Sequence, residues 1–249
     1  MSKLAELIRR ATRVEAAPIG FGPVRAKAAA TMLLVALLDD RSSQGGDAVA
    51  AGADVLLHTG RPSDRELAQT VSAAEGRPCG LLGPQADADG LARLRTAGLD
   101  FVVLEPRAPA SALLDQQLGF VLHLKGDSTD SQLRALDALP LDSILLEREA
   151  MPLTIQRQAD LQRLSGLTRK ALLLPIGADA AEQDLVCLRD AHVALVALAL
   201  EERGALDALR RLRGLIDGLP ARRRRREERP EATLPQVAAG EAEEEDDEE

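Results

Sequence analysis

Aromatic side chains are almost missing from this sequence of 249 residues, which contains three phenylalanines and neither tyrosine nor tryptophan. Many proteins bind nucleic-acid bases by stacking aromatic rings against them. This chain has few rings that could stack against bases, sugars or flavins. The scarcity therefore argues against a nucleic-acid or carbohydrate partner. It also requires the core to be built from aliphatic side chains.

Cysteine is scarce too, with Cys79 in a predicted strand and Cys187 in a predicted helix. Free buried thiols in a reducing compartment are the favoured interpretation, and a disulfide is the alternative. No apolar run approaches the roughly 18 residues that a membrane-spanning helix needs. The apolar stretch Ala28–Leu38 ends in Asp39-Asp40 without the small-residue pattern of a signal-peptide cleavage site. We therefore expect a cytoplasmic protein with no membrane span.

What the sequence does contain is an apolar run that returns eight times at near-regular spacing, each time followed by a stretch with helical character. Eight strand–helix units in about 250 residues predict an α/β fold, a single (β/α)8 barrel of the triosephosphate isomerase (TIM) type. An open doubly wound sheet is the alternative. The eight runs are Leu33–Leu38, Val55–Leu57, Cys79–Leu82, Phe101–Leu104, Phe120–Leu124, Ser143–Leu146, Ala171–Leu174 and Val193–Leu200.

A short repeat accompanies these runs. Ala-Gly-Ala-Asp at 51–54, Ala-Gly-Leu-Asp at 97–100 and Leu-Pro-Leu-Asp at 139–142 each precede an even-numbered strand. The glycine or proline ends the preceding helix, and the aspartate begins the strand. This difference between even and odd strands is typical of a barrel whose interior is filled in layers by alternate strands.

The chain divides into three parts. Residues 1–30 contain a short amphipathic helix and a Pro/Gly-containing stretch that could cover the bottom of the barrel, and the barrel itself is expected over 31–219. Residues 220–249 carry the arginine run Arg222–Arg226 and the acidic segment Glu241–Glu249. Like-charge blocks cannot form a packed core, so we expect a disordered tail. The arginines could bind RNA or an anionic membrane, but a solvated tail that screens its own charges is favoured.

Barrel enzymes place their catalytic groups where the strands end. Counting from the aspartate that opens each even strand, the fifth following residue is Thr59, Glu105 or Glu147. These positions should face the interior at one height, about 10 Å apart for the two glutamates. Two carboxylates in one mouth would have their pKa values pushed apart, which suits one as acid and the other as base.

Four further side chains are secondary candidates at strand ends: Asp39, His58, His123 and Lys125. His123 and Lys125 share a face, and Lys125 could bind a substrate carboxylate or, less readily, form a Schiff base. No close metal-ligand spacing such as HxH or HExxH exists, so we expect no metal site. The competing interpretation treats all these residues as helix caps and surface ion pairs. His192 precedes the last strand, at the opposite end, and is expected to be structural.

The loops at the carboxyl-terminal end of the predicted barrel have few features of a phosphate-binding site. Gly177-Ala178 could present amides to a phosphate, but the last strand leads into Glu201-Glu202, and aspartates begin several of the helices. The segment Glu66–Leu82, with its Pro-Cys-Gly, resembles the helix and Pro-x-Gly strand of flavin-dependent nitronate monooxygenases. That resemblance implies FMN. However, the family's asparagine is replaced by Leu82-Gly83, and its glycine-rich flavin-phosphate loops and catalytic histidine motif have no counterpart here. No cofactor is favoured, and FMN is a minor alternative.

The sequence thus predicts a small-molecule enzyme, lyase- or isomerase-like, that uses acid/base chemistry at the carboxyl-terminal mouth of a barrel. Its substrate is not identified. One alternative is a non-catalytic barrel that serves binding or assembly, and a homo-oligomer is compatible with either hypothesis. The other alternative is an FMN-linked oxidoreductase.

Overall fold

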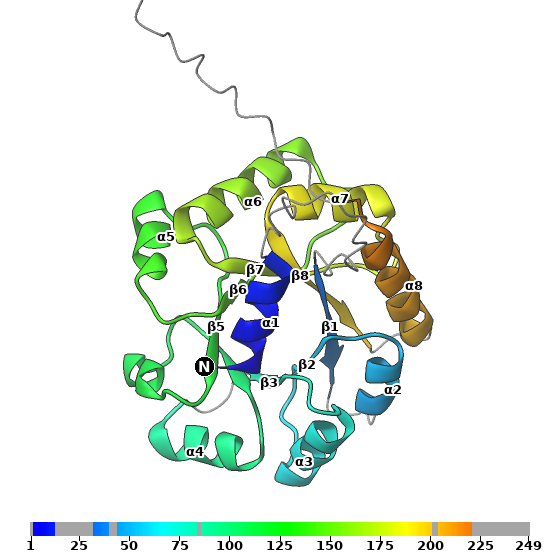
Figure 1. Ribbon diagram of the computed structural model, residues 1–249. Coiled ribbons are helices and arrows are strands. Elements are labelled where there is room, and N and C mark those ends of the chain that lie inside the picture. The colour runs from blue at the N-terminus through cyan, green and yellow to red at the C-terminus, as the bar shows by residue number, and fades with distance from the viewer. Residues whose placement is uncertain (1, 13–31, 40–43, 84–85, 201–203, 221–249) are drawn as a thin grey trace, which may run out of the picture.

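The computed structural model describes residues 2–12, 32–39, 44–83, 86–200 and 204–220. Within them eight parallel strands form a closed barrel in sequence order, and β8 pairs with β1 through Leu33 and Leu195. The predicted (β/α)8 barrel is confirmed, and the open sheet is excluded (Figure 1). The strands are β1 (Leu33–Leu38), β2 (Val55–His58), β3 (Cys79–Leu82), β4 (Phe101–Leu104), β5 (Gly119–His123), β6 (Ser143–Leu145), β7 (Ala171–Pro175) and β8 (Val193–Ala199).

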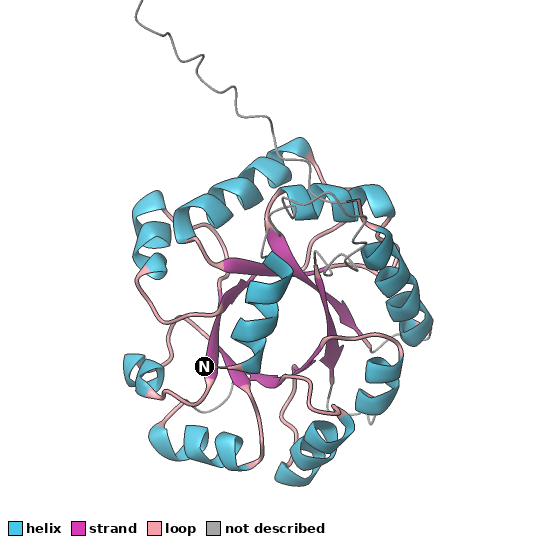
Figure 2. Cartoon of the chain, viewed as in Figure 1, coloured by secondary structure: helices cyan, strands magenta, loops and turns pink. Residues whose placement is uncertain are grey.

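Helices surround the strands on the outside of the barrel (Figure 2). After β4, however, the described chain forms only a short 3-10 helix, η1 (Ala110–Leu114), where the sequence predicts a helical stretch. Pro106 and Pro109 lie just before it. The α-helices are α2 (Gly45–Ala50), α3 (Asp64–Ala73), α4 (Ala88–Thr96), α5 (Asp130–Asp137), α6 (Ile155–Thr168), α7 (Glu182–Asp190) and α8 (Ala205–Gly218).

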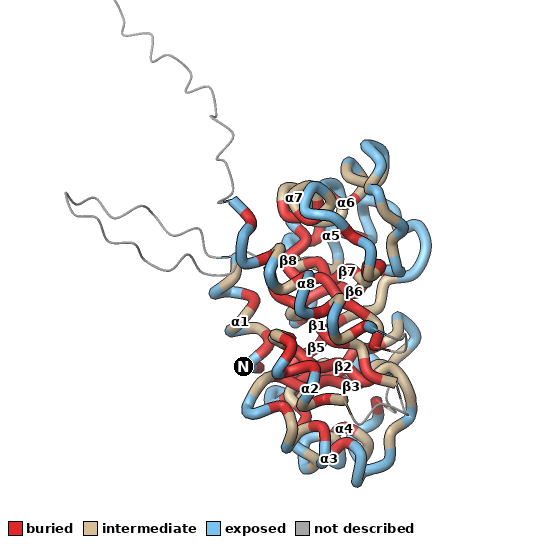
Figure 3. Tube along the Cα trace, turned by 90° about the vertical axis from the view of Figure 1, so that its right-hand side faces the viewer, coloured by how far each residue is buried: buried red, intermediate tan, exposed pale blue. Residues whose placement is uncertain are grey.

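The strand registers sort the apolar side chains into two sets. Because side chains alternate along a strand, every second residue faces the interior and its neighbours face the helices. The larger set packs between the strands and the surrounding helices, and Figure 3 shows the buried strands enclosed by more exposed chain. The interior set includes Val35, Leu57, Val103, Val121, Leu145, Leu173 and Ala197.

One aromatic ring belongs to this interior set, that of Phe101 on β4, which is 1% exposed. It lies against Gly80 on the neighbouring strand β3, with which it pairs in register. A Cβ atom built on Gly80 would be 2.3 Å from Cε2 of Phe101. Only glycine leaves room for the ring at this height of the barrel.

Helix α1 (Lys3–Thr12) closes the amino end of the barrel, across which it lies in Figure 1. Its Leu4 and Ile8 are buried and join the interior set of apolar side chains. The carboxylate of Asp100 accepts hydrogen bonds from the backbone amides of Lys3 and Leu4, at 2.8 and 2.9 Å. Two of the repeated strand-opening aspartates therefore hold this helix, because the carboxylate of Asp142 also accepts a hydrogen bond from the residue just before it.

That second contact is the hydroxyl of Ser2, whose Oγ lies 2.6 Å from Oδ2 of Asp142. The remaining strand-opening aspartate, Asp54, instead accepts hydrogen bonds from the amide of Leu34 and from Nη1 of Arg213, each at 2.8 Å. The repeat thus marks the amino end of the barrel. It fastens neighbouring elements there and does not reach the mouth.

The two cysteines are free, as predicted, with Cys79 buried and Cys187 half-buried. Burial raises the pKa of the Cys79 thiol to about 12. Among the described helices, none has the length and the apolar character needed to cross a membrane. The predicted tail with Arg222–Arg226 and Glu241–Glu249, the stretch 13–31 and the loop at 201–203 lie outside the described residues.

Candidate functional site

Three of the six candidate side chains meet at the carboxyl end of the barrel. Glu105 follows β4 directly, His123 ends β5, and Lys125 lies two residues further on the same side. Leu104 pairs with Leu122, so the next residues of the two strands, Glu105 and His123, are neighbours. Lys125 Nζ lies 3.0 Å from Oε1 of Glu105, and Nδ1 of His123 lies 3.4 Å from the same oxygen.

The two basic neighbours decide the ionisation of the glutamate. The hydrogen bond from Lys125 lowers the pKa of Glu105, and the nearby His123 lowers it further. The side chains of Glu105 and Lys125 are 42% and 51% exposed, whereas that of His123 is only 14% exposed. Solvent therefore weakens the attraction between the ions, but Glu105 is held as a carboxylate beside a mostly buried imidazole.

The imidazole presents its two nitrogens differently. Nδ1 is buried, and at 3.4 Å from Glu105 it makes a charge contact without a hydrogen bond to any described residue. A small closing movement of either side chain would convert this contact into a hydrogen bond. Nε2 makes no hydrogen bond to the described residues either, which leaves that nitrogen available to a ligand.

Glu147 is the other glutamate of the predicted pair. It lies two residues beyond Leu145, on the interior side of β6, and is exposed. Within the described residues it makes no hydrogen bond or ion pair. His123 pairs with Leu145 at the ends of β5 and β6, and Lys125 and Glu147 each follow two residues later. Lys125 pairs with Glu105, and the sharing of one proton by Glu105 and Glu147 stays a prediction.

Asp39 is half-buried just after β1. Since β1 and β5 stand four strands apart in a closed barrel of eight, Asp39 lies across the mouth from His123. The interior positions between them carry half-buried apolar side chains, which give the mouth an apolar floor. These are Leu37, Leu82, Pro175 and Ala199.

The structure separates His58 from the other candidates. Val55 and Leu57 face the interior, so His58 faces outward toward the helices, where it is 3% exposed. Its Nε2 lies 2.8 Å from Oγ1 of Thr70 on α3. Its role is to join the second strand to the helix that follows, and it does not reach the mouth.

The loop after β7 is occupied by side chains of the protein itself. Oδ1 of Asp179 lies 2.3 Å from the position that a Cβ on Gly177 would take. Arg211 on α8 donates hydrogen bonds to the carbonyl oxygens of Ala178 and Ala180, the latter at 3.0 Å. The sequence offered no signal for Arg211, because its contact depends on how α8 packs against this loop.

No group of three or more His, Cys, Asp or Glu side chains that could hold a metal ion occurs in the described part of the chain. The glycine of the Pro-Cys-Gly segment has a packing role, since Gly80 makes room for Phe101. Ser63 and Glu66 form a capping box at the start of α3, and the hydrogen bonds of Ser63 lower the pKa of Glu66. The residues of the segment Glu66–Leu82 thus have structural roles in a helix and the strand that follows it.

No family model and no curated protein matches the chain. The resemblance of Glu66–Leu82 to nitronate monooxygenases is therefore not shown, and the FMN-linked alternative that rests on it has no support from these comparisons. Solved structures do match. A mutant tryptophan synthase α-subunit from Pyrococcus furiosus is 15% identical, with a TM-score of 0.59, over 74% of this chain and 97% of that one.

Two further structures give the same result. KGPDC from Streptococcus mutans is 12% identical with a TM-score of 0.60, over 76% of this chain and 98% of its own. The homocysteine methyltransferase MmuM from Escherichia coli is 14% identical with a TM-score of 0.50, over 73% and 95%. At such identities the likeness concerns the fold alone. It establishes that this chain is a TIM-type (β/α)8 barrel.

Proposed function

We propose that this protein is a barrel enzyme that acts on a small molecule at the carboxyl-terminal mouth by acid/base chemistry, with a lyase- or isomerase-like reaction. The observation that supports the proposal is the shared contact of the Glu105 carboxylate with His123 and Lys125. A carboxylate, an imidazole and an ammonium group at the ends of adjacent strands are the groups that proton transfer at a carbon centre requires.

In this proposal His123 transfers the proton. The Glu105 carboxylate, kept ionised by Lys125, orients the ring through Nδ1 and stabilises the imidazolium that forms when Nε2 takes a proton. Glu105 is therefore a positioning residue for His123, in place of the acid of a glutamate pair. An imidazole can both accept and release a proton, as this role demands.

Lys125 would provide positive charge for a substrate oxygen that becomes anionic during the reaction, such as that of an enolate. Glu147, which follows the neighbouring strand β6, and Asp39, across the mouth, are further carboxylates that could exchange a second proton. The apolar floor of the mouth suits a small substrate with a hydrocarbon portion.

Exchange of carbon-bound hydrogen in D2O tests this proposal even while the product of the reaction is unidentified. The protein would be incubated with a panel of small aldehydes, ketones and 2-oxo acids, and the loss of the α-proton signal followed by NMR. We expect exchange with at least one compound and a decrease of about 100-fold or more in H123N. E6Q, which alters an exposed ion pair on α1 at the far end of the barrel, is the matched control and should keep full exchange.

Exchange that persists in H123N would contradict the role of His123. The main competing function is a non-catalytic barrel used for binding or assembly, which the exposure of Glu105 and Lys125 favours, because exposed ion pairs commonly stabilise a surface and nothing more. A complete lack of exchange across the panel would favour that function over the proposed one.

A further inference from the structure

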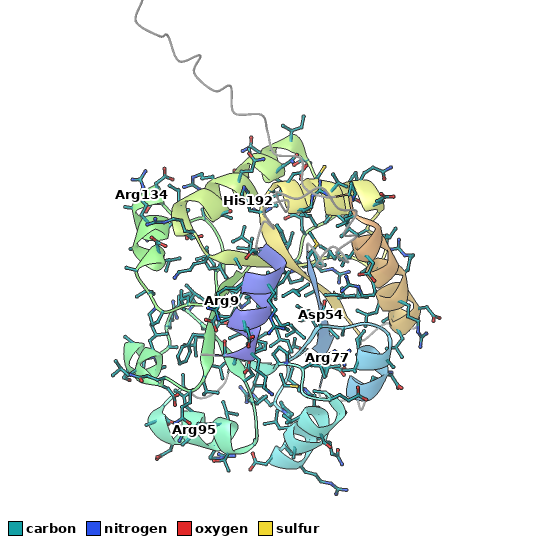
Figure 4. All side chains as sticks on the ribbon, in the orientation of Figure 1. Arg9, Asp54, Arg77, Arg95, Arg134 and His192 are labelled. Carbon is teal, nitrogen blue, oxygen red and sulfur yellow. The ribbon has the colours of Figure 1, made fainter. Side chains whose placement is uncertain are left out.

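A groove of about 1000 Å³ lies on the amino-terminal face of the barrel, opposite the mouth. It runs between α1 and α6 and reaches the starts of β7 and β8. Its volume is that of a small-molecule site. Figure 4 labels Arg9 on α1 and His192 just before β8, two of the side chains that line it.

The charged groups of this groove are mainly basic. Arg9, Arg169, Lys170 and His192 line it together with Asp142 and Asp190. Both acidic groups are already engaged with donors: Oδ2 of Asp142 lies 2.6 Å from the Ser2 hydroxyl, and Oδ1 of Asp190 lies 2.8 Å from Nη2 of Arg189.

Two of the basic groups, Lys170 and Arg169, are less fully neutralised. Lys170 Nζ donates to the carbonyl oxygen of Leu139 at 2.8 Å, a contact that leaves its charge uncompensated. Arg169 pairs with Asp137, but its side chain remains 76% exposed, so solvent screens this pair strongly. A ligand with a negative group would find an ammonium and a guanidinium from consecutive residues at one end of the groove.

The backbone at this groove is unusual as well. Arg169 and His192 have φ angles of 49° and 67°, in the left-handed region that side chains with a Cβ disfavour. Glycine takes the position after the C-cap of α2 and α4, as Gly52 and Gly98, where α7 has His192. Of the three non-glycine residues with positive φ in the described chain, the third being Glu75, two line the groove. Such strain tends to be retained where a side chain serves a site.

We infer that the amino-face groove binds a small molecule through a phosphate or carboxylate group, which Arg169, Lys170 and His192 contact directly. The guanidinium matches either anion with two parallel hydrogen bonds. The Ser165 hydroxyl, which also lines the groove, can bond to the polar remainder of the ligand, whereas the Thr12 hydroxyl already donates to the carbonyl oxygen of Ile8 at 2.8 Å. This site is distinct from the mouth, so its occupancy does not depend on the proposed reaction.

Glycine substitutions provide a test that does not endanger folding. R169G and H192G remove a basic side chain and relieve the left-handed strain at the same time, so both proteins should have a higher Tm than the wild type. E75G relieves the same strain after α3, outside the groove, and is the matched control. Its ion pair with Arg77 is long, at 3.8 Å, and exposed, so its loss should matter little.

Binding would be measured calorimetrically at constant ionic strength with inorganic phosphate and, separately, with citrate. We expect millimolar or tighter binding of at least one probe to the wild type, and which probe binds distinguishes a phosphate from a carboxylate ligand. The Kd should rise about tenfold or more in R169G and H192G and stay unchanged in E75G and H123N. Equal Kd values in R169G, H192G and E75G, or no binding of either probe to the wild type, would overturn the inference.

Discussion

Gly80 and Phe101 face each other from neighbouring strands, so closely that a Cβ on the glycine would lie 2.3 Å from the ring. In the described chain this ring is the aromatic group of the barrel interior, and the glycine determines that it fits. The pair connects the scarcity of aromatic residues in the sequence with the way the barrel interior is filled. An aliphatic barrel accommodates one large ring by leaving out a side chain beside it.

The substitution G80A should destabilise the protein by about 3 kcal/mol, because neither the strand backbone nor the ring can move far in a close-packed interior. Unfolding in urea, followed by circular dichroism, measures the effect. G214A is the control, since a Cβ on this exposed glycine within α8 meets nothing, and it should stabilise by about 0.5–1 kcal/mol. Replacing Phe101 by leucine in the G80A background should recover part of the loss, and an additive double mutant would contradict the contact.

The substitution K125M should raise the pKa of Glu105 toward its ordinary value, because the largest cause of its depression is the hydrogen bond from Lys125. The measurement is an NMR titration of the Glu105 carboxyl group. A depressed pKa in the folded state stabilises the protein above the unfolded-state pKa, and this contribution is lost as the pH falls through the folded-state pKa. Since the pair is exposed, the loss of stability in K125M should be below about 1 kcal/mol.

The control for this titration is R93M, which removes an exposed ion pair with Asp64 on the outside of the barrel. The pKa of Glu105 should be the same in R93M as in the wild type. An unchanged pKa of Glu105 in K125M would show that the two side chains do not associate in solution.

The substitution D100A should release α1 from the amino end of the barrel, since Asp100 accepts hydrogen bonds from two backbone amides in its first turn. The cost should be about 1–2 kcal/mol, as for the loss of an N-terminal helix cap. Hydrogen exchange of the amides of α1 should become faster. The control is D87A. Asp87 caps α4, with its Oδ1 2.7 Å from the amide nitrogen of Gly90, and its loss should leave exchange in α1 unchanged. Equal protection of α1 in both variants would contradict this role of Asp100.

The substitution D142N should stabilise the protein at neutral pH. Burial raises the pKa of Asp142, with a further contribution from the nearby Asp100, so the folded state binds its proton more readily than the unfolded state. The stability of the wild type must then decrease as the pH rises from the unfolded-state pKa to the folded-state pKa. The advantage of D142N should therefore be largest at neutral pH and disappear in acid. Unfolding free energies over a pH series measure it, and a difference independent of pH would refute the prediction.

Much of the barrel could be predicted from the sequence because strand length, spacing and the aspartate repeat are local features. The interior positions of Glu105 and Glu147 follow from counting along the strand. The same count places His58 one position earlier, and therefore outward, where it contacts Thr70. The stretch of helical character predicted after β4 is a 3-10 helix, a distinction that the spacing of the units does not give.

The site itself could be predicted only in part. The carboxylate with which a lysine pairs depends on the register between strands. The sequence alone does not give the pairing of Leu104 with Leu122, which brings Lys125 and His123 to Glu105. The amino-face groove was not predicted at all. It arises from the space that α1 leaves beside α6, and no periodic pattern encodes that distance.

Helix α1 has one more consequence, which concerns the order of events during synthesis. Its anchors, Asp100 and Asp142, open strands that are made about a hundred residues or more after the helix itself. Until those strands have left the ribosome, Leu4 and Ile8 have no place to bury their side chains. Sealing of the amino end must therefore be a late step, and a chaperone that shields short apolar segments would encounter this helix well before the barrel exists.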